Sequence, residues 1–357
     1  MTYDVLVVGG GPCGLAAAIY ARMQGLSVCV FERKSGIIDK ACGEGVMPHG
    51  IEQLSRLGVQ IERAYPFRGI RYIHGAAPSI VAQGQFSGGA GYGVRRIELS
   101  RAMLERAKAL KVDWRYESAD QVSVLADEVS VNGVTRRYLL AADGLHSAIS
   151  RQFGMRLKHT RAPRYGMRQH FNTPPWTDHV EVYWCEQGEA YVTPVDAHTV
   201  GVAFLFNKPQ QFDELLDRLP CLKERLGTPA SELRGAGPFH QSTQRRVSGR
   251  LLLIGDAAGY VDPLTGEGLS VGFKTATLAV DSIVNNRPTD YERAWRKVMR
   301  RYNLMTYALL WLTQWIWIRR NLVGILRRLP WLFDVSLRLL GGSSSHEQLM
   351  ENVKDEG

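Results

Sequence analysis

A glycine-rich turn directly after a short apolar strand is the feature that most limits how this chain can fold. Residues 3–8 form a β-branched, apolar run, as expected of a buried parallel strand. Three glycines within residues 9–14 follow it and lead into residues 15–24, which are rich in helix-forming side chains. Residues 26–31 then return as a second strand. This strand–helix–strand order predicts an α/β domain that binds a dinucleotide.

Each glycine of the turn has a separate expected role. Gly9 makes the tight turn, Gly11 lets the backbone approach a pyrophosphate, and Gly14 lets the helix and strand pack closely. The N-terminus of the helix offers free N–H groups to the phosphates. Glu32, at the end of the second strand, is placed to bind ribose hydroxyls. The cofactor-binding residues expected in this region are Gly9, Gly11, Pro12, Cys13, Gly14, Glu32 and Arg33.

Two later strands also end in aspartate and glycine. Residues 137–142 run into Asp143-Gly144, and residues 250–254 run into Gly255-Asp256. With the first turn, these stretches resemble the para-hydroxybenzoate hydroxylase-like superfamily of flavoproteins. The resemblance implies one non-covalent FAD, with Asp256 at its ribityl chain and Asp143-Gly144 near its pyrophosphate. For Asp143, a role as a helix N-cap and strand-end turn is the alternative.

The segment from Asp39 to Pro48 resembles the Lys-x-Cys-Gly-x-Gly-x-x-Pro segment of the geranylgeranyl reductase-like branch of this superfamily. The resemblance implies that Cys42 faces both the flavin and the substrate, as a catalytic residue. The alternative for Cys42 is a small buried hydrophobe. Gly43 and Gly45 fit a loop whose backbone approaches the flavin closely.

Other cofactor contacts are carried over from the family in the same way. Arg96 matches an arginine that opens a helix near the phosphates, although an exposed arginine on a helix surface is the alternative. The loop before the helix at 269–284 implies backbone N–H groups near the reduced flavin. Its expected contacts are Pro263, Gly266, Gly268 and Leu269.

The predicted architecture is α/β: a Rossmann-like FAD-binding domain of the glutathione reductase type with an inserted β-sheet domain. The FAD-binding domain is expected at 1–70, 95–155 and 245–285. The β-sheet substrate domain is expected at 71–94 and 156–244, where strand-like runs alternate with Gly and Pro turns. A helical segment at 286–340 and a disordered tail at 341–357 complete the prediction. A second dinucleotide fold is not expected.

Substrate contacts are expected from the inserted sheet, at Tyr183, Tyr191 and Pro194. Prenyl reductases of the branch carry a Tyr-x-Trp-x-Phe-Pro motif that lines a lipid tunnel. Here the corresponding residues read Glu189-Ala-Tyr-Val-Thr-Pro194, which argues against reduction of a prenyl chain. His170 is a candidate catalytic base for a phenol proton, with a structural histidine as the alternative.

Composition and charge restrict the class of protein. No signal peptide is expected, because the first strand begins at residue 3. Five cysteines include no Cys-x-x-Cys pair, which fits a reducing cytoplasm and predicts neither disulfides nor a metal site. The net charge is +9, yet no nucleic-acid module accompanies it, so no nucleic-acid partner is expected. The excess of basic residues is densest from Arg296 to Arg328 and fits either a solvated face or contact with anionic lipid or a carrier protein.

Residues 303–320 are apolar and aromatic but too short and interrupted to span a bilayer comfortably. They are expected to pack on the FAD-binding domain, to cover a substrate entrance, or to lie at a membrane surface as an interfacial helix. The leading function expected is a cytoplasmic FAD-dependent monooxygenase that uses NAD(P)H and O₂ to hydroxylate a hydrophobic, aromatic or polyketide-like molecule. The alternatives are a flavin-dependent reductase of an isoprenoid or polyene double bond, and a flavin-bearing maturation or assembly partner of another protein.

Overall fold

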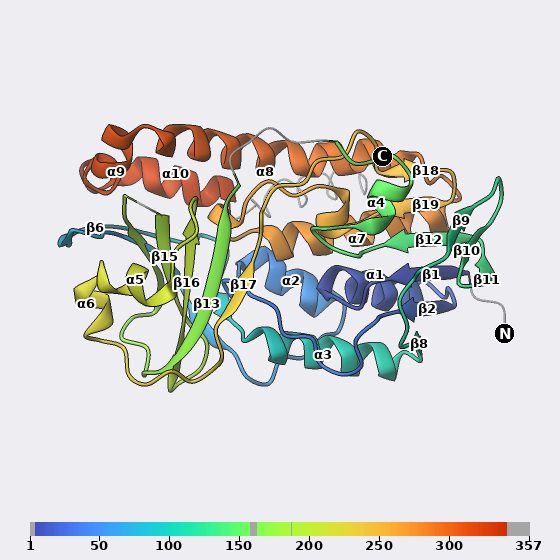
Figure 1. Ribbon diagram of the computed structural model, residues 1–357, viewed down its shortest axis with the longest axis horizontal. Coiled ribbons are helices and arrows are strands. Elements are labelled where there is room, and N and C mark those ends of the chain that lie inside the picture. The colour runs from blue at the N-terminus through green and yellow to red at the C-terminus, as the bar shows by residue number, and fades with distance from the viewer. Residues whose placement is uncertain (1–3, 158–162, 187, 341–357) are drawn as a thin grey trace, which may run out of the picture.

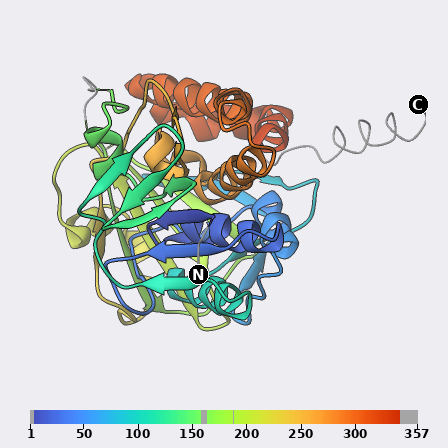
Figure 2. The same cartoon turned by 90° about the vertical axis from the view of Figure 1, so that its right-hand side faces the viewer.

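The computed structural model describes residues 4–157, 163–186 and 188–340; the tail predicted at 341–357 lies outside these ranges. Two large sheets lie at opposite ends of the long axis, and three C-terminal helices run along one edge (Figure 1). The view along that axis shows the same helices above the sheet that starts the chain (Figure 2). The predicted α/β class is confirmed.

The first sheet contains the predicted N-terminal strands in its centre. β1 pairs in parallel with β2 on one side and β12 on the other. Every residue of these three strands is buried, which explains why they read as continuous apolar runs. The spatial order is β18 (Val247–Ser248), β19 (Leu251–Leu253), β12 (Tyr138–Ala141), β1 (Val5–Val8), β2 (Val28–Phe31) and β8 (Asp113–Arg115).

The second sheet has seven strands from two separate stretches of the chain. Residues 69–85 supply two strands and residues 165–236 supply the other five. Only β14 and β5 pair in parallel within this sheet, and the other neighbours are antiparallel. Its order is β17 (Arg234–Ala236), β13 (Tyr165–Asn172), β16 (Thr199–Phe206), β15 (Gly188–Pro194), β14 (His179–Trp184), β5 (Gly69–His74) and β6 (Ala77–Gln85).

Two three-stranded sheets complete the strands of the described residues. The first joins β3 (Gly45–Val46), β7 (Gly91–Gly93) and β4 (Tyr65–Phe67), and therefore holds the end of the cysteine-containing loop. The second joins β11 (Val134–Arg136), β10 (Val129–Val131) and β9 (Val122–Val124) beside the first large sheet.

Helices cover the first sheet and both faces of the second. α1 packs against α7 and α3, while α9 and α10 pack on β5 and β6. The smaller helices α5 and α6 cover the other face of the second sheet. The helices are α1 (Pro12–Met23), α2 (Pro48–Arg56), α3 (Arg96–Ala109), α4 (Ala148–Gln152), α5 (Phe212–Asp217), α6 (Pro220–Lys223), α7 (Gly268–Val284), α8 (Asp290–Gln314), α9 (Ile316–Arg328) and α10 (Pro330–Leu340), with 3₁₀ turns η1 (Gly255–Ala258) and η2 (Pro263–Thr265).

The C-terminal segment divides its contacts between the two sheets. α8 packs on α7 of the dinucleotide-type domain, whereas α9 and α10 cover one face of the seven-stranded sheet. One of the three expectations was that this segment packs on the predicted FAD-binding domain. That expectation holds for α8, whereas α9 and α10 pack on the other sheet.

Candidate functional site

The turn after β1 is built so that only glycine fits at two of its positions. Gly9 has a φ of +106°, and a Cβ on it would lie 2.4 Å from the carbonyl oxygen of Ala142. A Cβ on Gly14 would lie 1.9 Å from the carbonyl oxygen of Gly9. Any side chain at either residue would therefore separate α1 from the ends of β1 and β12.

Three other glycines face open space instead. A Cβ on Gly11, Gly43 or Gly144 would meet no atom within 4 Å. Gly11 is the N-cap of α1, whose first turn has no acidic residue and no side-chain cap, and Pro12 occupies its first position. The N–H groups of Cys13 and Gly14 at this helix end are consequently available to an anion.

Glu32 lies beside the glycine turn at the end of β2. Its carboxylate accepts hydrogen bonds from the backbone N–H of Gly10 at 2.8 Å and of Lys34 at 3.0 Å. These bonds orient the acid at the edge of the turn, as a ribose contact requires. Arg33, the next residue, is exposed.

Asp143 has one satisfied carboxylate oxygen and one without a partner. Its Oδ2 accepts a hydrogen bond from the backbone N–H of Ile149 in α4 at 3.1 Å. Its Oδ1 is buried and has no partner within the described residues. The bond to α4 supports the helix-capping alternative, and the unpaired oxygen leaves room for a ligand contact as well.

Asp256, Arg96 and Lys40 come together from three distant parts of the chain. Burial raises the pKa of the Asp256 carboxyl above its ordinary value, and the positive charges of Arg96 and Lys40 oppose that rise. Arg96 is only 8 % exposed, so it is not the surface arginine of the alternative interpretation, and its Nε has no partner in the described part of the chain.

Cys13 packs between the first and last cofactor motifs. A Cβ on Gly255 would lie 2.8 Å from its Sγ, and one on Gly272 of α7 would lie 2.5 Å from it. Burial raises the pKa of the Cys13 thiol to about 12, so the group is neutral. Cys13 therefore contributes shape to this contact rather than charge.

The loop before β3 carries Cys42 and a strained acid, Glu44. Glu44 has a φ of +59°, in the left-handed region, between two glycines. Its N–H donates to the Cys42 Sγ at 3.4 Å. Burial raises the pKa of the Cys42 thiol, the charge of Arg96 opposes this, and the thiol stays protonated at neutral pH.

Glu44 is buried and links the loop to both domains. One carboxylate oxygen accepts from the Arg96 N–H at 2.8 Å, and the other lies 2.6 Å from the His170 Nε2. Arg168, two residues before His170 on β13, donates to the Asp39 carboxylate at 2.6 Å. This network fixes the loop from both of its ends. Glu44 and Arg168 were not identified from the sequence, although an acid between two glycines is a detectable signal of a constrained loop.

His170 is fully enclosed by these partners. It is 1 % exposed, and its Nδ1 lies 2.8 Å from the Ser231 Oγ and 3.2 Å from an Arg168 nitrogen. Both ring nitrogens thus have protein partners in the structure. Its catalytic role stays a prediction, and the contacts fit the structural alternative.

The predicted substrate residues lie on different faces of the seven-stranded sheet. The Tyr191 hydroxyl donates to the Leu264 carbonyl at 3.0 Å, on the face toward the flavin loops and α9. Pro194 ends the same strand, next to Thr193, whose hydroxyl donates to the Gly43 carbonyl at 2.9 Å. Tyr183 is buried on the opposite face, in the cluster covered by α5 and α6. Tyr183 and Tyr191 therefore cannot line one pocket.

The loop before α7 adopts the expected open turn. Pro263 begins η2, Gly266 has a φ of +69°, and Gly268 begins α7 without a side-chain cap. The first N–H groups of α7, including that of the half-buried Leu269, are free of a capping side chain for the same reason.

Glu267 and His49 meet beside this loop as neutral groups. Their closest nitrogen and oxygen atoms are 3.9 Å apart. Burial raises the pKa of Glu267 to about 8 and lowers the pKa of His49 to about 4. Attraction between a charged glutamate and a charged histidine would lower the pKa of Glu267 and raise that of His49. Both pKa values move the other way, so the cost of removing the two groups from water outweighs their attraction.

Glu189 occupies the position of the first tyrosine in the Tyr-x-Trp-x-Phe-Pro motif of prenyl reductases, and it forms a buried ion-pair network. It is 1 % exposed and pairs with Arg164 at 2.5 Å and with Arg319 of α9 at 2.7 Å. Arg164 also reaches Asp262 at 3.1 Å, next to the flavin loop. Burial raises the pKa of Asp262 to about 6. Through these ion pairs, Glu189 connects the seven-stranded sheet with the loop at Asp262 and with α9.

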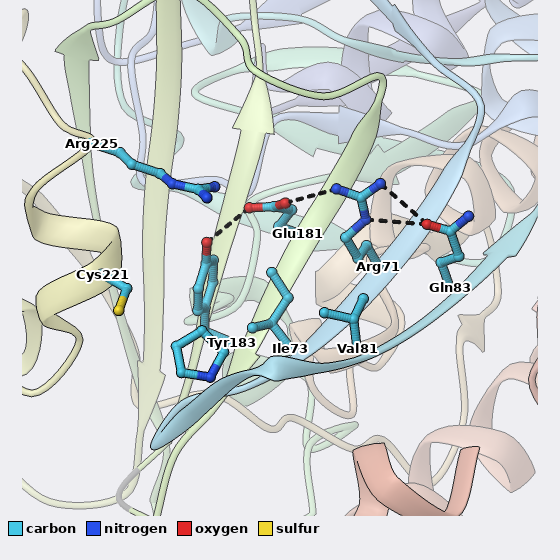
Figure 3. Close-up of a pocket in the computed structure, with 9 residues that line it drawn as sticks. Arg71, Ile73, Val81, Gln83, Glu181, Tyr183, Cys221 and Arg225 are labelled. Atoms are coloured by element: carbon cyan, nitrogen blue, oxygen red, sulfur yellow. Dashed lines mark hydrogen bonds and ion pairs between the residues drawn. The ribbon is translucent and has the colours of Figure 1, made fainter. Parts of the chain in front are cut away.

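A cavity of about 290 Å³ lies on the face of the sheet that holds Tyr183 (Figure 3). Glu181 is at its centre and accepts from the Tyr183 hydroxyl at 2.8 Å and from Arg71 at 3.3 Å. Arg225 and Cys221 border it from the side of α6. Because strand side chains alternate between faces, this cavity is separated by the sheet from Tyr191 and the cysteine loop.

The residues present fit FAD on observations of this structure. Gly11, Gly43 and Gly144 belong to three separate motifs, and the space beside each of them leaves room for a ligand. The N-terminus of α1 offers N–H groups to the pyrophosphate of FAD. Asp143 and Arg96 hold polar atoms without partners in the described residues, and the Asp256 carboxylate accepts no hydrogen bond there. Glu32, Asp143, Arg96 and Asp256 would hold the cofactor from the ribose to the flavin end.

Two curated reductases are similar to this chain over most of its length. The chain is 29% identical to the menaquinone reductase of Mycolicibacterium smegmatis over 331 residues, covering 84% of this chain and 80% of that protein. It is 27% identical to digeranylgeranylglycerophospholipid reductase 1 of Methanopyrus kandleri over 313 residues, covering 78% and 80%.

Solved structures share the fold. The flavin-dependent brominase Bmp2 superposes with a TM-score of 0.79 at 18% identity over all of both chains. The anhydrotetracycline hydroxylase OxyS of Streptomyces rimosus gives 0.71 at 20% identity, covering 96% of this chain and 76% of that one. The profile of the FAD binding domain family matches residues 2–284. The chain therefore belongs to the FAD binding domain family and is an FAD-dependent oxidoreductase.

Proposed function

We propose that this protein reduces a carbon–carbon double bond of an apolar, isoprenoid-type substrate, with NAD(P)H as the electron donor. The proposal rests on the protonated thiol of Cys42. The next acid of the same loop, Glu44, donates its N–H to this thiol and accepts a hydrogen bond from the backbone N–H of Arg96. The names of the two reductases similar to this chain support the reaction class.

When bound, FAD would supply the hydride that reduces the double bond. The chain supplies the proton: the Cys42 S–H bond breaks as a new C–H bond forms on the neighbouring carbon, and water returns a proton to the thiolate. Glu44 holds the thiol in place through its N–H, and its contacts with Arg168 and His170 keep the loop in its strained conformation. Apolar residues beside the loop, Met47, Phe67 and Leu264, exclude water.

An anaerobic assay tests the proposal. Purified protein is given NADPH and a menaquinone with an unsaturated side chain, and products are read by mass for the addition of two hydrogens. Cys42→Ala should lower product formation on the order of 100-fold, because a positioned acid contributes at least that much. NADPH-driven flavin reduction should be nearly unchanged in this variant. Cys221→Ser, at an exposed cysteine, is the matched control and should leave turnover intact.

A monooxygenase that hydroxylates a hydrophobic aromatic molecule is the second candidate. It is favoured by Glu189 and Thr193, which replace two aromatic residues of the prenyl reductase tunnel motif. A product that forms only in air and gains an oxygen atom would overturn the reductase and support this candidate. The absence of NADPH oxidation with either substrate class would instead support a flavin-bearing assembly partner.

A further inference from the structure

Apolar side chains cover the outward face of α8 and the turn into α9. Leu304 and Trp311 on α8, and Trp315 just after its end, follow helical spacing. The buried residues of α8 lie on its other side and are Met299, Tyr302, Thr306 and Thr313. Trp311, Trp315 and Trp317 are 59, 58 and 69 % exposed. The residues of this surface, here called the α8–α9 face, are Leu304, Trp311, Leu312, Trp315, Ile316 and Trp317.

The segment of the chain that carries this face is basic. Residues 293–333 contain nine Lys and Arg and no Asp or Glu. Lys297 and Arg300 continue the outward face of α8 toward its start, and both are exposed. Arg327 and Arg328 are exposed at the end of α9. None of these four forms an ion pair with a described residue, so their charge is available to a partner.

The face is held rigidly at one end of the molecule. α8 runs along one long edge, and its turn into α9 lies at the end opposite the N-terminal region (Figure 1). Arg319 ties the start of α9 to Glu189 and to the Cys185 carbonyl at 2.6 Å. Val323 and Leu326 bury the inner side of α9 against the sheet. The exposed aromatic rings therefore do not turn inward to complete the core.

We propose that the α8–α9 face binds the surface of an anionic phospholipid bilayer. Its tryptophans would lie at the headgroup level, with Arg300, Arg327 and Arg328 contacting lipid phosphates. The binding is peripheral, because no helix within the described ranges combines the length and apolar character that a bilayer crossing requires. The inference does not rest on the proposed reaction, since it concerns binding alone.

Charge favours a lipid surface over a second copy of the chain. Two copies meeting through this face would bring together two segments that each carry nine basic residues and, within 293–333, no acid. An anionic bilayer supplies both the opposite charge and the apolar layer below it. Tryptophan and arginine are side chains that tolerate such a half-wet, half-apolar boundary.

Vesicle flotation of the full-length holoprotein tests the proposal. The probes are vesicles of phosphatidylcholine alone and of phosphatidylcholine with phosphatidylglycerol, each at low and high salt. The wild type should float with the anionic vesicles and dissociate as salt rises. Trp311→Ala with Trp315→Ala and Trp317→Ala should weaken binding on the order of tenfold, and so should Arg327→Gln with Arg328→Gln.

Matched controls use exposed residues away from the face. Tyr116→Ala with Leu125→Ala removes exposed apolar groups near the other end of the molecule, and Arg63→Gln with Lys208→Gln removes two exposed charges. Both should bind like the wild type, and all variants should keep FAD and their unfolding temperature.

Two results would overturn the proposal. One is equal flotation of the wild type and the tryptophan variant. The other is a lipid-free dimer that becomes monomeric in that variant, which would assign the face to a second copy.

Discussion

Asp256 holds a half-buried carboxyl group whose partners in the structure are nearby charges rather than hydrogen bonds. Arg96 and Lys40 act on it electrostatically, but no described residue gives its carboxylate a hydrogen bond. Asp256→Ala should therefore weaken FAD binding by about 1 kcal/mol, the net value of one hydrogen bond. Fluorescence titration of the FAD-free protein measures the change.

Asp256→Asn is the matched control for this prediction. It keeps an acceptor oxygen and removes the charge, so its FAD affinity should lie between those of the wild type and Asp256→Ala. Wild-type affinity in Asp256→Ala would contradict the assignment of Asp256 to the cofactor.

The sequence predicted the residues whose role depends on local backbone geometry. It did not predict those whose role depends on side chains far away in the sequence. Gly9 and Gly14 are required by close contacts within one short strand–turn–helix segment, so their spacing was sufficient. Glu44 works through Arg96 and His170, which are far away in the sequence, and it was missed. Tyr183 was grouped with Tyr191 because alternation along a single strand does not show which face of the sheet a neighbouring strand presents.

At the scale of elements, the contact between α2 and α7 makes stability depend on pH. Glu267 of the folded protein keeps its proton up to about pH 8, against 4.5 for an unperturbed glutamate. The folded state then binds more protons, so this contribution is complete at low pH and is lost as the pH rises through about 8. His49 acts in the opposite direction between about pH 4 and 6.5, because its pKa is lowered.

Of these two groups, only Glu267 changes its contribution between pH 6.5 and 8. The free energy of unfolding should fall there by about 1.4 kcal/mol per pH unit. Chemical denaturation at the two pH values measures this slope in the wild type and in Glu267→Gln, which should remove it. Glu62→Gln, at an exposed glutamate, should retain it. The same slope in Glu267→Gln and the wild type would show that another group is responsible.

At the scale of the whole molecule, one acid joins the sheet to the C-terminal helices. Glu189→Ala leaves Arg164 and Arg319 without their shared partner and should lower the free energy of unfolding by about 3 kcal/mol. The control is Glu186→Ala. It removes the exposed partner of Arg320, which neighbours Arg319 on α9, and should lower the free energy of unfolding by less than about 1 kcal/mol. Denaturation followed by tryptophan fluorescence compares them, and equal losses would contradict a joining role for Glu189.

The chain order of the strands has a consequence for how the protein is made. Val5 pairs with Tyr138, and Gly69 pairs with His179, so each sheet needs strands synthesised long after its first ones. During translation β1 and β5 must therefore each wait with one unpaired edge while later strands emerge, a condition in which chains associate wrongly. From this topology we expect the chain to depend on chaperones during synthesis, and we expect fragments that end before residue 179 not to fold, because they lack the partner of β5.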